Sequence, residues 1–169
     1  SYVSIENARE NLEKETGNKS FDAVCKETYN EWNELLSKIK VEGGTTEDKT
    51  VFYTALYHTL IHPNTLNDFN GEYPEIKTGK IGKTDGTRYT VFSLWDTYRN
   101  VHQLMSLVYP QQQLDMVKSM LDMYDENGWL PKWELNSTET FTMVGDPASI
   151  VITDTYVRGI KDFDVQKAY

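Results

Sequence analysis

The chain has 169 residues, of which 26 are acidic and 17 are basic, so its formal net charge is −9. This balance argues against nucleic acid or an anionic membrane surface as a partner, because both require clustered Lys and Arg. The single cysteine excludes an internal disulfide, and no apolar run approaches the roughly 18 residues of a membrane span. The length and the 38% hydrophobic content indicate one domain or a part of one.

Three N-capped helices are predicted in the first third of the chain. The predicted caps and stops are, in order, Ser4 and Gly17, Ser20 and Gly43, and Thr45 and Pro63. The second helix is the most clearly amphipathic, with apolar residues at three- and four-residue spacing. Residues 1–3 are better interpreted as the end of a strand.

Glycines and irregular spacing then predict a loop or small hairpin over residues 68–87. Four further helices are predicted, over residues 92–109, 111–126 and 148–160 and in a short segment capped by residues 162–164. An aromatic-rich loop separates the second and third of these. The helix over 92–109 is apolar on nearly every side, which is typical of a helix buried in a larger structure.

The predicted helix over 111–126 should direct Leu114, Val117, Leu121 and Tyr124 inward, and Gly128 should end it. The whole pattern is helix, long loop, helix. It shows neither a repeated motif nor the βαβ alternation of a parallel sheet. We therefore assign the chain to the all-α class, with about seven helices and long aromatic-rich loops.

Trp95 and Asp96 are the first candidate ligand contacts. They are adjacent near the start of a predicted helix, where an aromatic face could stack on the C–H face of a sugar while the carboxylate accepts hydroxyl hydrogen bonds. A carboxylate in a first helical turn can equally interact with the helix dipole alone. Spacing leaves both interpretations open.

Glu139 is the second candidate, because it follows Trp133 in the aromatic loop, where a carboxylate is better placed to meet a ligand than to support a helix. His58 and His62 are four residues apart, which could place two imidazoles on one metal ion. No third ligand lies at helical spacing from them, and we favour a capping or partly buried role. Many acidic residues are present, but spacing selects no catalytic carboxylate pair.

Several ordered motifs resemble the family 92 glycoside hydrolases, which are α-1,2-mannosidases. They are Phe52-Tyr53-Thr54-Ala55-Leu56-Tyr57-His58, His62-Pro63-Asn64, Asn70-Gly71-Glu72-Tyr73, Phe92-Ser93-Leu94-Trp95-Asp96-Thr97-Tyr98-Arg99, Gly128-Trp129-Leu130-Pro131, Glu139-Thr140 and Met143-Val144-Gly145-Asp146-Pro147. The segment from Ser4 to Leu12 also resembles the family's entry into its helical domain. The resemblance covers effectively the whole chain.

The resemblance implies an (α/α)6-barrel catalytic domain, of which residues 1–169 would be the N-terminal part, with residues 1–3 leading from a preceding β-sandwich domain. It implies a calcium-dependent enzyme that inverts the anomeric centre while removing terminal α-mannose from oligosaccharides or N-glycans. Members are mostly bacterial, which implies a periplasmic, cell-surface or secreted protein. The calcium ligands cannot be placed on this sequence, since hard-oxygen sites depend on backbone and carboxylate geometry.

By the same resemblance, Trp95 and Asp96 belong to the mannose pocket, and Glu139, Arg99 and Trp133 lie near it. The general acid and base are expected after Tyr169, so no residue here is assigned a proton-transfer role. The alternative is a noncatalytic carbohydrate-binding or scaffold module with the same helices. A third, an unrelated helical domain, would bury Trp95 and Asp96 without a facing cavity.

Overall fold

The computed structural model describes all residues from Ser1 to Tyr169. Its helices are α1 (Ile5–Glu15), α2 (Phe21–Leu36), α3 (Thr46–Thr59), α4 (Leu94–Thr97), α5 (Val101–Val108), α6 (Pro110–Asn127), α7 (Pro147–Val157) and α8 (Val165–Ala168). They hold about half of the residues, so the predicted helical character is confirmed. The (α/α)6 barrel stays a prediction. None of the helices is long and apolar enough to cross a membrane.

Six short strands form three separate antiparallel pairs. β1 (Asn64–Thr65) pairs with β4 (Tyr89–Thr90), β2 (Glu72–Pro74) with β3 (Ile81–Lys83), and β5 (Phe92–Ser93) with β6 (Trp133–Glu134). The β2–β3 pair is the hairpin predicted within residues 68–87. Residues 1–3 pair with no strand of this chain, and the Ser1 hydroxyl instead donates to Asp68 Oδ2 at 2.7 Å.

The three predicted N-caps are confirmed. The side chains of Ser4, Ser20 and Thr45 each accept a hydrogen bond from the backbone N–H three residues later. At Thr45 the bond is reciprocal, because the Asp48 carboxylate also accepts from the Thr45 N–H, which forms a capping box. Sequence chemistry alone therefore sets the starts of α1, α2 and α3.

The predicted helix over residues 92–109 is wrong. Phe92 and Ser93 form β5, a short helix α4 follows, and a break at residues 98–100 separates it from α5. A run that is apolar on every side fits a buried strand as well as a buried helix, and only a partner decides between them. The partner here is β6, some 40 residues further on, and the split gives eight helices instead of seven.

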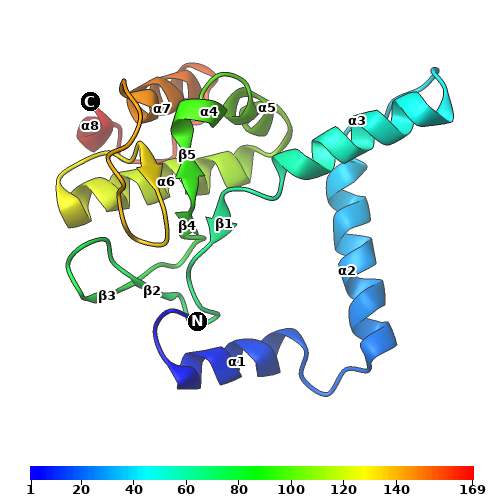
Figure 1. The fold of residues 1–169 in the computed structure, drawn as a ribbon, viewed down its shortest axis with the longest axis horizontal. Helices are drawn as coiled ribbons and strands as arrows, with labels where there is room; N and C mark the ends of the chain where they lie inside the picture. The colour runs from blue at the N-terminus through cyan, green and yellow to red at the C-terminus, as the bar shows by residue number, and fades with distance from the viewer.

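The hydrophobic core lies among α5, α6 and α7 and the β4–β5 segment. Leu114, Val117 and Leu121 point into it as predicted, whereas Tyr124 is 44% exposed and its predicted inward position is wrong. Gly128 ends α6 in the left-handed conformation with φ 82°, as its predicted role requires. This compact part carries the segments from β4 to α8 (Figure 1).

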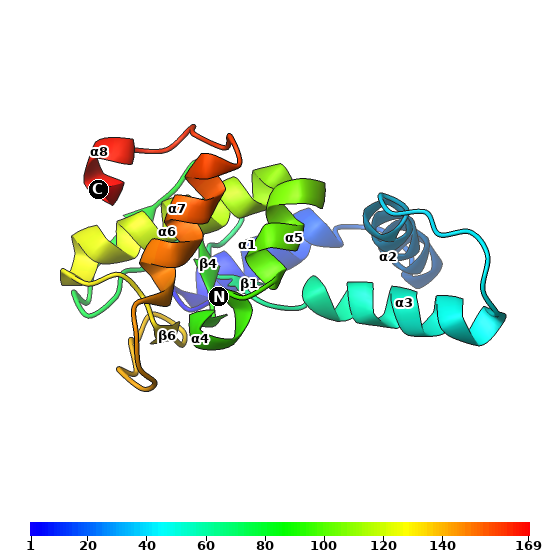
Figure 2. The same ribbon diagram turned by 90° about the horizontal axis from the view of Figure 1, so that it is seen from above.

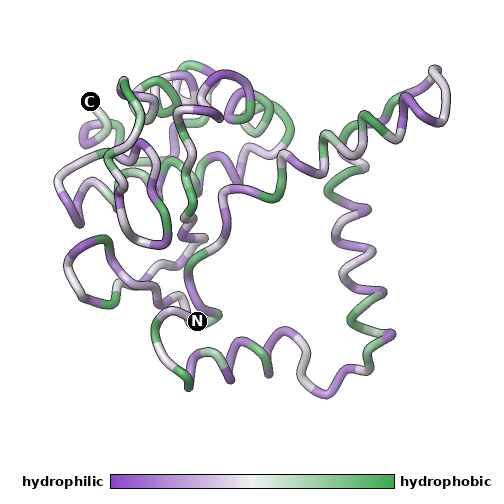
Figure 3. The backbone as a smooth tube through the Cα atoms, viewed as in Figure 1, coloured by the Kyte–Doolittle hydropathy of each residue, from purple (hydrophilic) through white to green (hydrophobic).

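Helices α2 and α3 project from the compact part, whereas α1 lies beside the loop at Asp68, to which Asn7 and Asn11 donate hydrogen bonds (Figures 1 and 2). α2 buries no residue, although its apolar and polar residues alternate along the helix (Figure 3), and Phe21 remains 81% exposed. Its contact with α3 includes the rings of Trp32 and Tyr57, whose centroids are 4.6 Å apart. The apolar face that the sequence predicts therefore exists: its C-terminal half packs against the core through Leu35, Leu36 and Ile39, whereas Phe21 at its start stays exposed.

Arg88 fastens the β2–β3 hairpin to α6. Its side chain is fully buried, it donates to Glu126 Oε2 at 2.9 Å and to the Ser119 carbonyl at 3.2 Å, and it lies 4.7 Å from the Tyr73 ring centroid. Burial raises the pKa of Glu126, and the Arg88 charge opposes that rise. Glu126 also accepts from the Ile76 N–H at 2.7 Å.

The close approach of Gly71 and Thr84, at the open end of the β2–β3 hairpin, can be tested. Gly71 has φ 86°, and a Cβ there would lie 2.3 Å from the Thr84 carbonyl oxygen, whereas Gly79 has φ 71° and open space around it. Gly71→Ala should therefore lower the free energy of unfolding by more than about 1 kcal/mol beyond the loss in Gly79→Ala, which carries the left-handed penalty without the clash. Chemical denaturation of the two variants measures the difference, and equal losses would contradict the packing described.

Candidate sugar-binding site

The Trp95–Asp96 pair lies on a tight corner where β5 passes directly into α4. Leu94, which opens the helix, is fully buried and anchors the corner. Trp95 is half-buried and Asp96 is exposed, and the Asp96 carboxylate bonds to no other side chain or backbone group of the chain. The corner thus carries a half-buried aromatic ring next in sequence to an exposed carboxylate, and their joint contact with a sugar stays a prediction.

Arg99 lies behind the Trp95 ring. Its guanidinium carbon is 4.8 Å from the Trp95 centroid and 5.3 Å from that of Tyr98. An arginine at this distance from an indole is held by cation–π attraction of roughly 0.5–1 kcal/mol at an exposed site. Arg99 therefore helps to orient the Trp95 ring.

Trp133 reaches the same corner through the sheet pairing. Ser93 faces Trp133 in the β5–β6 register, and the Leu94 N–H donates to the Lys132 carbonyl at 3.2 Å. The segment that carries Trp133 therefore lies directly beside the start of α4. We call Trp95, Asp96, Arg99 and Trp133 the Trp95 cluster.

Glu139 closes the loop that follows β6. Its Oε2 accepts from the Lys132 N–H at 2.8 Å, and its Oε1 accepts from the Trp133 N–H at 3.2 Å and the Phe141 N–H at 2.9 Å. Glu139 also lines a pocket of about 240 Å³ that Phe141 and Lys77 border. Its carboxylate thus holds the backbone that carries Trp133, and a direct contact with sugar stays a prediction.

Glu134 is a feature that the sequence analysis missed. Its side chain is fully buried, and burial raises the pKa of its carboxyl group, while three hydrogen-bond donors oppose the rise. The donors are the Thr90 hydroxyl at 2.8 Å, the Val91 N–H at 2.9 Å and the Ser137 N–H at 2.6 Å. Glutamate is rarely buried, so only its neighbours in space could have revealed it.

The backbone around the cluster is strained. Val91, Asn136, Ser137, Phe141 and Met143 have φ between 45° and 65°, and only one other non-glycine residue of the chain, Lys77, has a positive φ. Such conformations cost of order 1–3 kcal/mol each and persist where surrounding contacts fix them. Strain is thus concentrated at the two segments that carry the predicted ligand contacts.

A series of buried side-chain hydrogen bonds connects α4 to the helical core. The Thr97 hydroxyl lies 3.0 Å from His102 Nε2, His102 Nδ1 lies 3.0 Å from Gln113 Oε1, and the Gln113 amide donates to Thr155 Oγ1 at 2.9 Å. Since the Gln113 amide nitrogen donates to Thr155, its oxygen must accept from His102, which places a proton on Nδ1. Burial favours the neutral imidazole, because it lowers the pKa of His102. This series of hydrogen-bonded side chains links α4, α5, α6 and α7.

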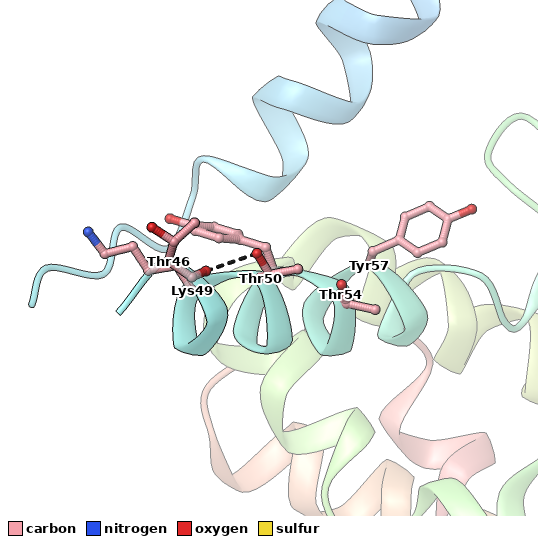
Figure 4. A pocket seen from close by; sticks show the side chains of 6 residues that line it. Thr46, Lys49, Thr50, Thr54 and Tyr57 are labelled. Atoms are coloured by element: carbon pink, nitrogen blue, oxygen red, sulfur yellow. Dashed lines mark hydrogen bonds between the residues drawn. The ribbon is translucent and has the colours of Figure 1, made fainter. Parts of the chain in front are cut away.

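No group of three or more His, Cys, Asp or Glu side chains converges in a way that could hold a metal ion. His62 Nδ1 instead lies 3.0 Å from Asn64 Oδ1. A groove of about 420 Å³ lies along α3, lined by threonine, lysine and tyrosine side chains including Thr46, Lys49 and Tyr57 (Figure 4). That helix carries none of the predicted ligand contacts, so the Trp95 cluster is the better candidate.

Comparison with known proteins identifies the family of the chain. The Glycosyl hydrolase family 92 catalytic domain matches residues 7–169. Two solved structures from Bacteroides thetaiotaomicron are similar over all or nearly all of the chain. The family GH92 α-mannosidase BT3965 in complex with mannoimidazole is 36% identical over 100% of this chain, with a TM-score of 0.94, and the inverting mannosidase BT2199 is 30% identical over 99%, with a TM-score of 0.92.

An uncharacterized secreted glycosidase of Arthroderma benhamiae is 27% identical over 96% of the chain. The chain spans 17% of that relative's length and 22% and 23% of the two mannosidase chains. The fold and its helical domain are those of a glycoside hydrolase. The chain belongs to glycoside hydrolase family 92 and corresponds to part of its catalytic domain.

The buried imidazole predicts a pH dependence of stability. Burial lowers the pKa of His102 to about 4 from an ordinary 6.5, so between these values the unfolded chain binds a proton that the folded protein excludes. The His102 contribution to the free energy of unfolding should be complete above pH 6.5 and fall by up to about 3 kcal/mol as the pH drops towards 4. Denaturation from pH 4 to 7 should show a flatter profile for His102→Gln, and an unchanged one for the exposed His58→Gln. A His102→Gln profile like the wild type would contradict the buried neutral imidazole.

Proposed function

We propose that this chain is part of an inverting, calcium-dependent exo-α-mannosidase that removes terminal α-1,2-linked mannose, and that the Trp95 cluster forms part of its mannose pocket. The observation that carries the proposal is the combination of a 0.94 TM-score to an α-mannosidase bound to mannoimidazole with a corner in the matched region that carries a half-buried tryptophan and an exposed carboxylate. The inverting outcome rests on the likeness to an inverting mannosidase. The calcium requirement and the linkage rest on the family motifs.

The cluster offers the chemistry that a neutral sugar requires. The Trp95 face can stack on the C–H face of a pyranose, and Asp96 can accept hydrogen bonds from two of its hydroxyl groups. Arg99 stabilises the ring orientation and can donate to a further oxygen. These residues bind mannose and hold its pyranose ring in one orientation before the glycosidic bond is cleaved.

The acid–base chemistry and the calcium ion would come from elsewhere in the polypeptide. Inversion requires two carboxyl groups about 6.5–9.5 Å apart, with one protonating the leaving oxygen and the other activating water. The exposed Asp96 belongs to the mannose-contact side of the pocket, and Glu139 is committed to backbone donors. We expect the calcium ligands to lie largely outside these residues, in which no three His, Cys, Asp or Glu side chains converge.

The natural substrates would be mannose-containing oligosaccharides or N-glycans. The remaining barrel helices and a β-sandwich domain of the same protein would be its structural partners. The likeness to a secreted glycosidase supports export from the cell, to the periplasm, the cell surface or the medium. A noncatalytic carbohydrate-binding module is the alternative that the first experiment below separates from an enzyme.

The full-length protein should release mannose from α-1,2-mannobiose. Proton NMR at early times should show β-mannose as the first product, because inversion of an α-glycoside gives the β-anomer. A chelator should abolish the release, and added calcium should restore it. Binding of the disaccharide without release would favour the noncatalytic module, and release by the isolated 169 residues would contradict the placement of the acid and base outside them.

The Trp95 cluster should contribute to binding and not to folding. In the full-length protein, Trp95→Ala and Asp96→Ala should each lower kcat/KM at least 100-fold, because each removes a contact that orients the sugar, while the melting temperature stays within a few degrees. Trp32→Ala is the matched control, since it removes an equally large ring from the α2–α3 contact. It should lower thermal stability and leave kcat/KM unchanged. Full activity in Trp95→Ala would contradict the site.

A further inference from the structure

We propose that Glu134 is a positioning residue of the mannose pocket: its buried carboxylate holds in place both segments that carry the predicted sugar contacts. This inference rests on the proposed function of the Trp95 cluster. Glu134 itself does not face the sugar site, because successive side chains of a strand point to opposite faces, so that Trp133 points away from the Glu134 side of β6. Glu134 therefore acts through its neighbours.

The first segment that Glu134 holds is the bend before β5. Val91 is the single residue between β4, which pairs with β1, and β5, which pairs with β6, so the chain must change partners within one residue. It does so at φ 64°, which is a true outlier for a β-branched residue. The Val91 N–H donates to Glu134 Oε2 at 2.9 Å, and the adjacent Thr90 hydroxyl donates to Oε1.

The second segment is the loop that leads to Glu139. Ser137 has φ 62°, and its N–H donates to Glu134 Oε1 at 2.6 Å. Two residues later, Glu139 accepts from the backbone of Lys132 and Trp133. One carboxylate thus bonds to Val91, which precedes the Trp95 corner, and to Ser137, which precedes Glu139.

No cation contacts this carboxylate, although the positive charge of Arg88 opposes the burial-driven rise in its pKa from a greater distance. It makes no ion pair within 4 Å, and its three partners are two backbone N–H groups and a hydroxyl. All three are donors, and an ionised carboxylate can accept from all of them. A glutamine cannot accept from all three. If its amide oxygen takes the place of Oε1, where the Thr90 hydroxyl and the Ser137 N–H donate, its NH₂ group faces the Val91 N–H, and two donors then oppose each other.

The expected result of Glu134→Gln in the full-length protein is therefore relaxation of Val91 and displacement of the corner that carries Trp95. A displacement of about 1 Å can cost on the order of 100-fold in rate, so kcat/KM for α-1,2-mannobiose should fall about 100-fold. Adding Val91→Gly should restore most of that loss, because glycine adopts a positive φ without help. Val91→Gly alone should stay within about threefold of the wild type.

Glu126→Gln is the matched control for loss of a buried carboxylate. Glu126 accepts from Arg88, Ile76 and Tyr73 and shares no hydrogen bond with residues 90–95 or 133–139. This variant should lower the melting temperature and leave kcat/KM unchanged. A general effect of core damage would instead lower kcat/KM in both variants and would not respond to Val91→Gly.

Three results would overturn the inference: wild-type kcat/KM in Glu134→Gln, an equal loss in Glu126→Gln, or no recovery on adding Val91→Gly. If the wild-type protein releases no mannose, the proposed function fails, and a crystal structure of Glu134→Gln decides the positioning role separately. A Trp95 side chain displaced by about 1 Å or more would support that role. A corner that superimposes on the wild type would overturn it.

Discussion

The candidate site depends on the pairing of two strands that are only two residues long. β5 and β6 cannot be stable by themselves, since an isolated two-stranded hairpin is marginal in water even at greater length. They persist because Phe92, Leu94 and Glu134 are buried on the inner side of the pair, and because the Glu134 carboxylate bonds to the backbone on both sides of it. Without that pairing, Trp133 would have no fixed relation to the corner that carries Trp95.

Local chemistry in the sequence predicts the helix ends well. Ser4, Ser20 and Thr45 cap helices because their side-chain oxygens meet nearby N–H groups, and Gly128 ends α6 because it accepts a left-handed φ. These effects involve residues within four positions of one another. They require no knowledge of the remaining fold.

The errors occur where a distant partner decides the structure. Phe92 and Ser93 look helical until β6 is known, and Tyr124 looks inward until its neighbours are known. In the candidate site the sequence identifies Trp95, Asp96 and Trp133 by residue type and resemblance, and the structure brings their segments together. The sequence could not identify Glu134, because a glutamate between Trp133 and Leu135 carries no local sign that it is buried beside Thr90 and Val91.

The strain at Val91 and Ser137 and the burial of Glu134 depend on each other. Two left-handed residues cost of order 1–3 kcal/mol each, and a buried carboxylate without donors would cost several kcal/mol. When the two N–H groups point at the carboxylate, the hydrogen bonds offset both costs at once, so neither feature is stable without the other. The corner geometry is then fixed jointly by these local polar contacts and by Phe92 and Leu94, which are buried in the hydrophobic core. A change in the core away from these two residues should therefore alter stability more readily than it alters the position of Trp95.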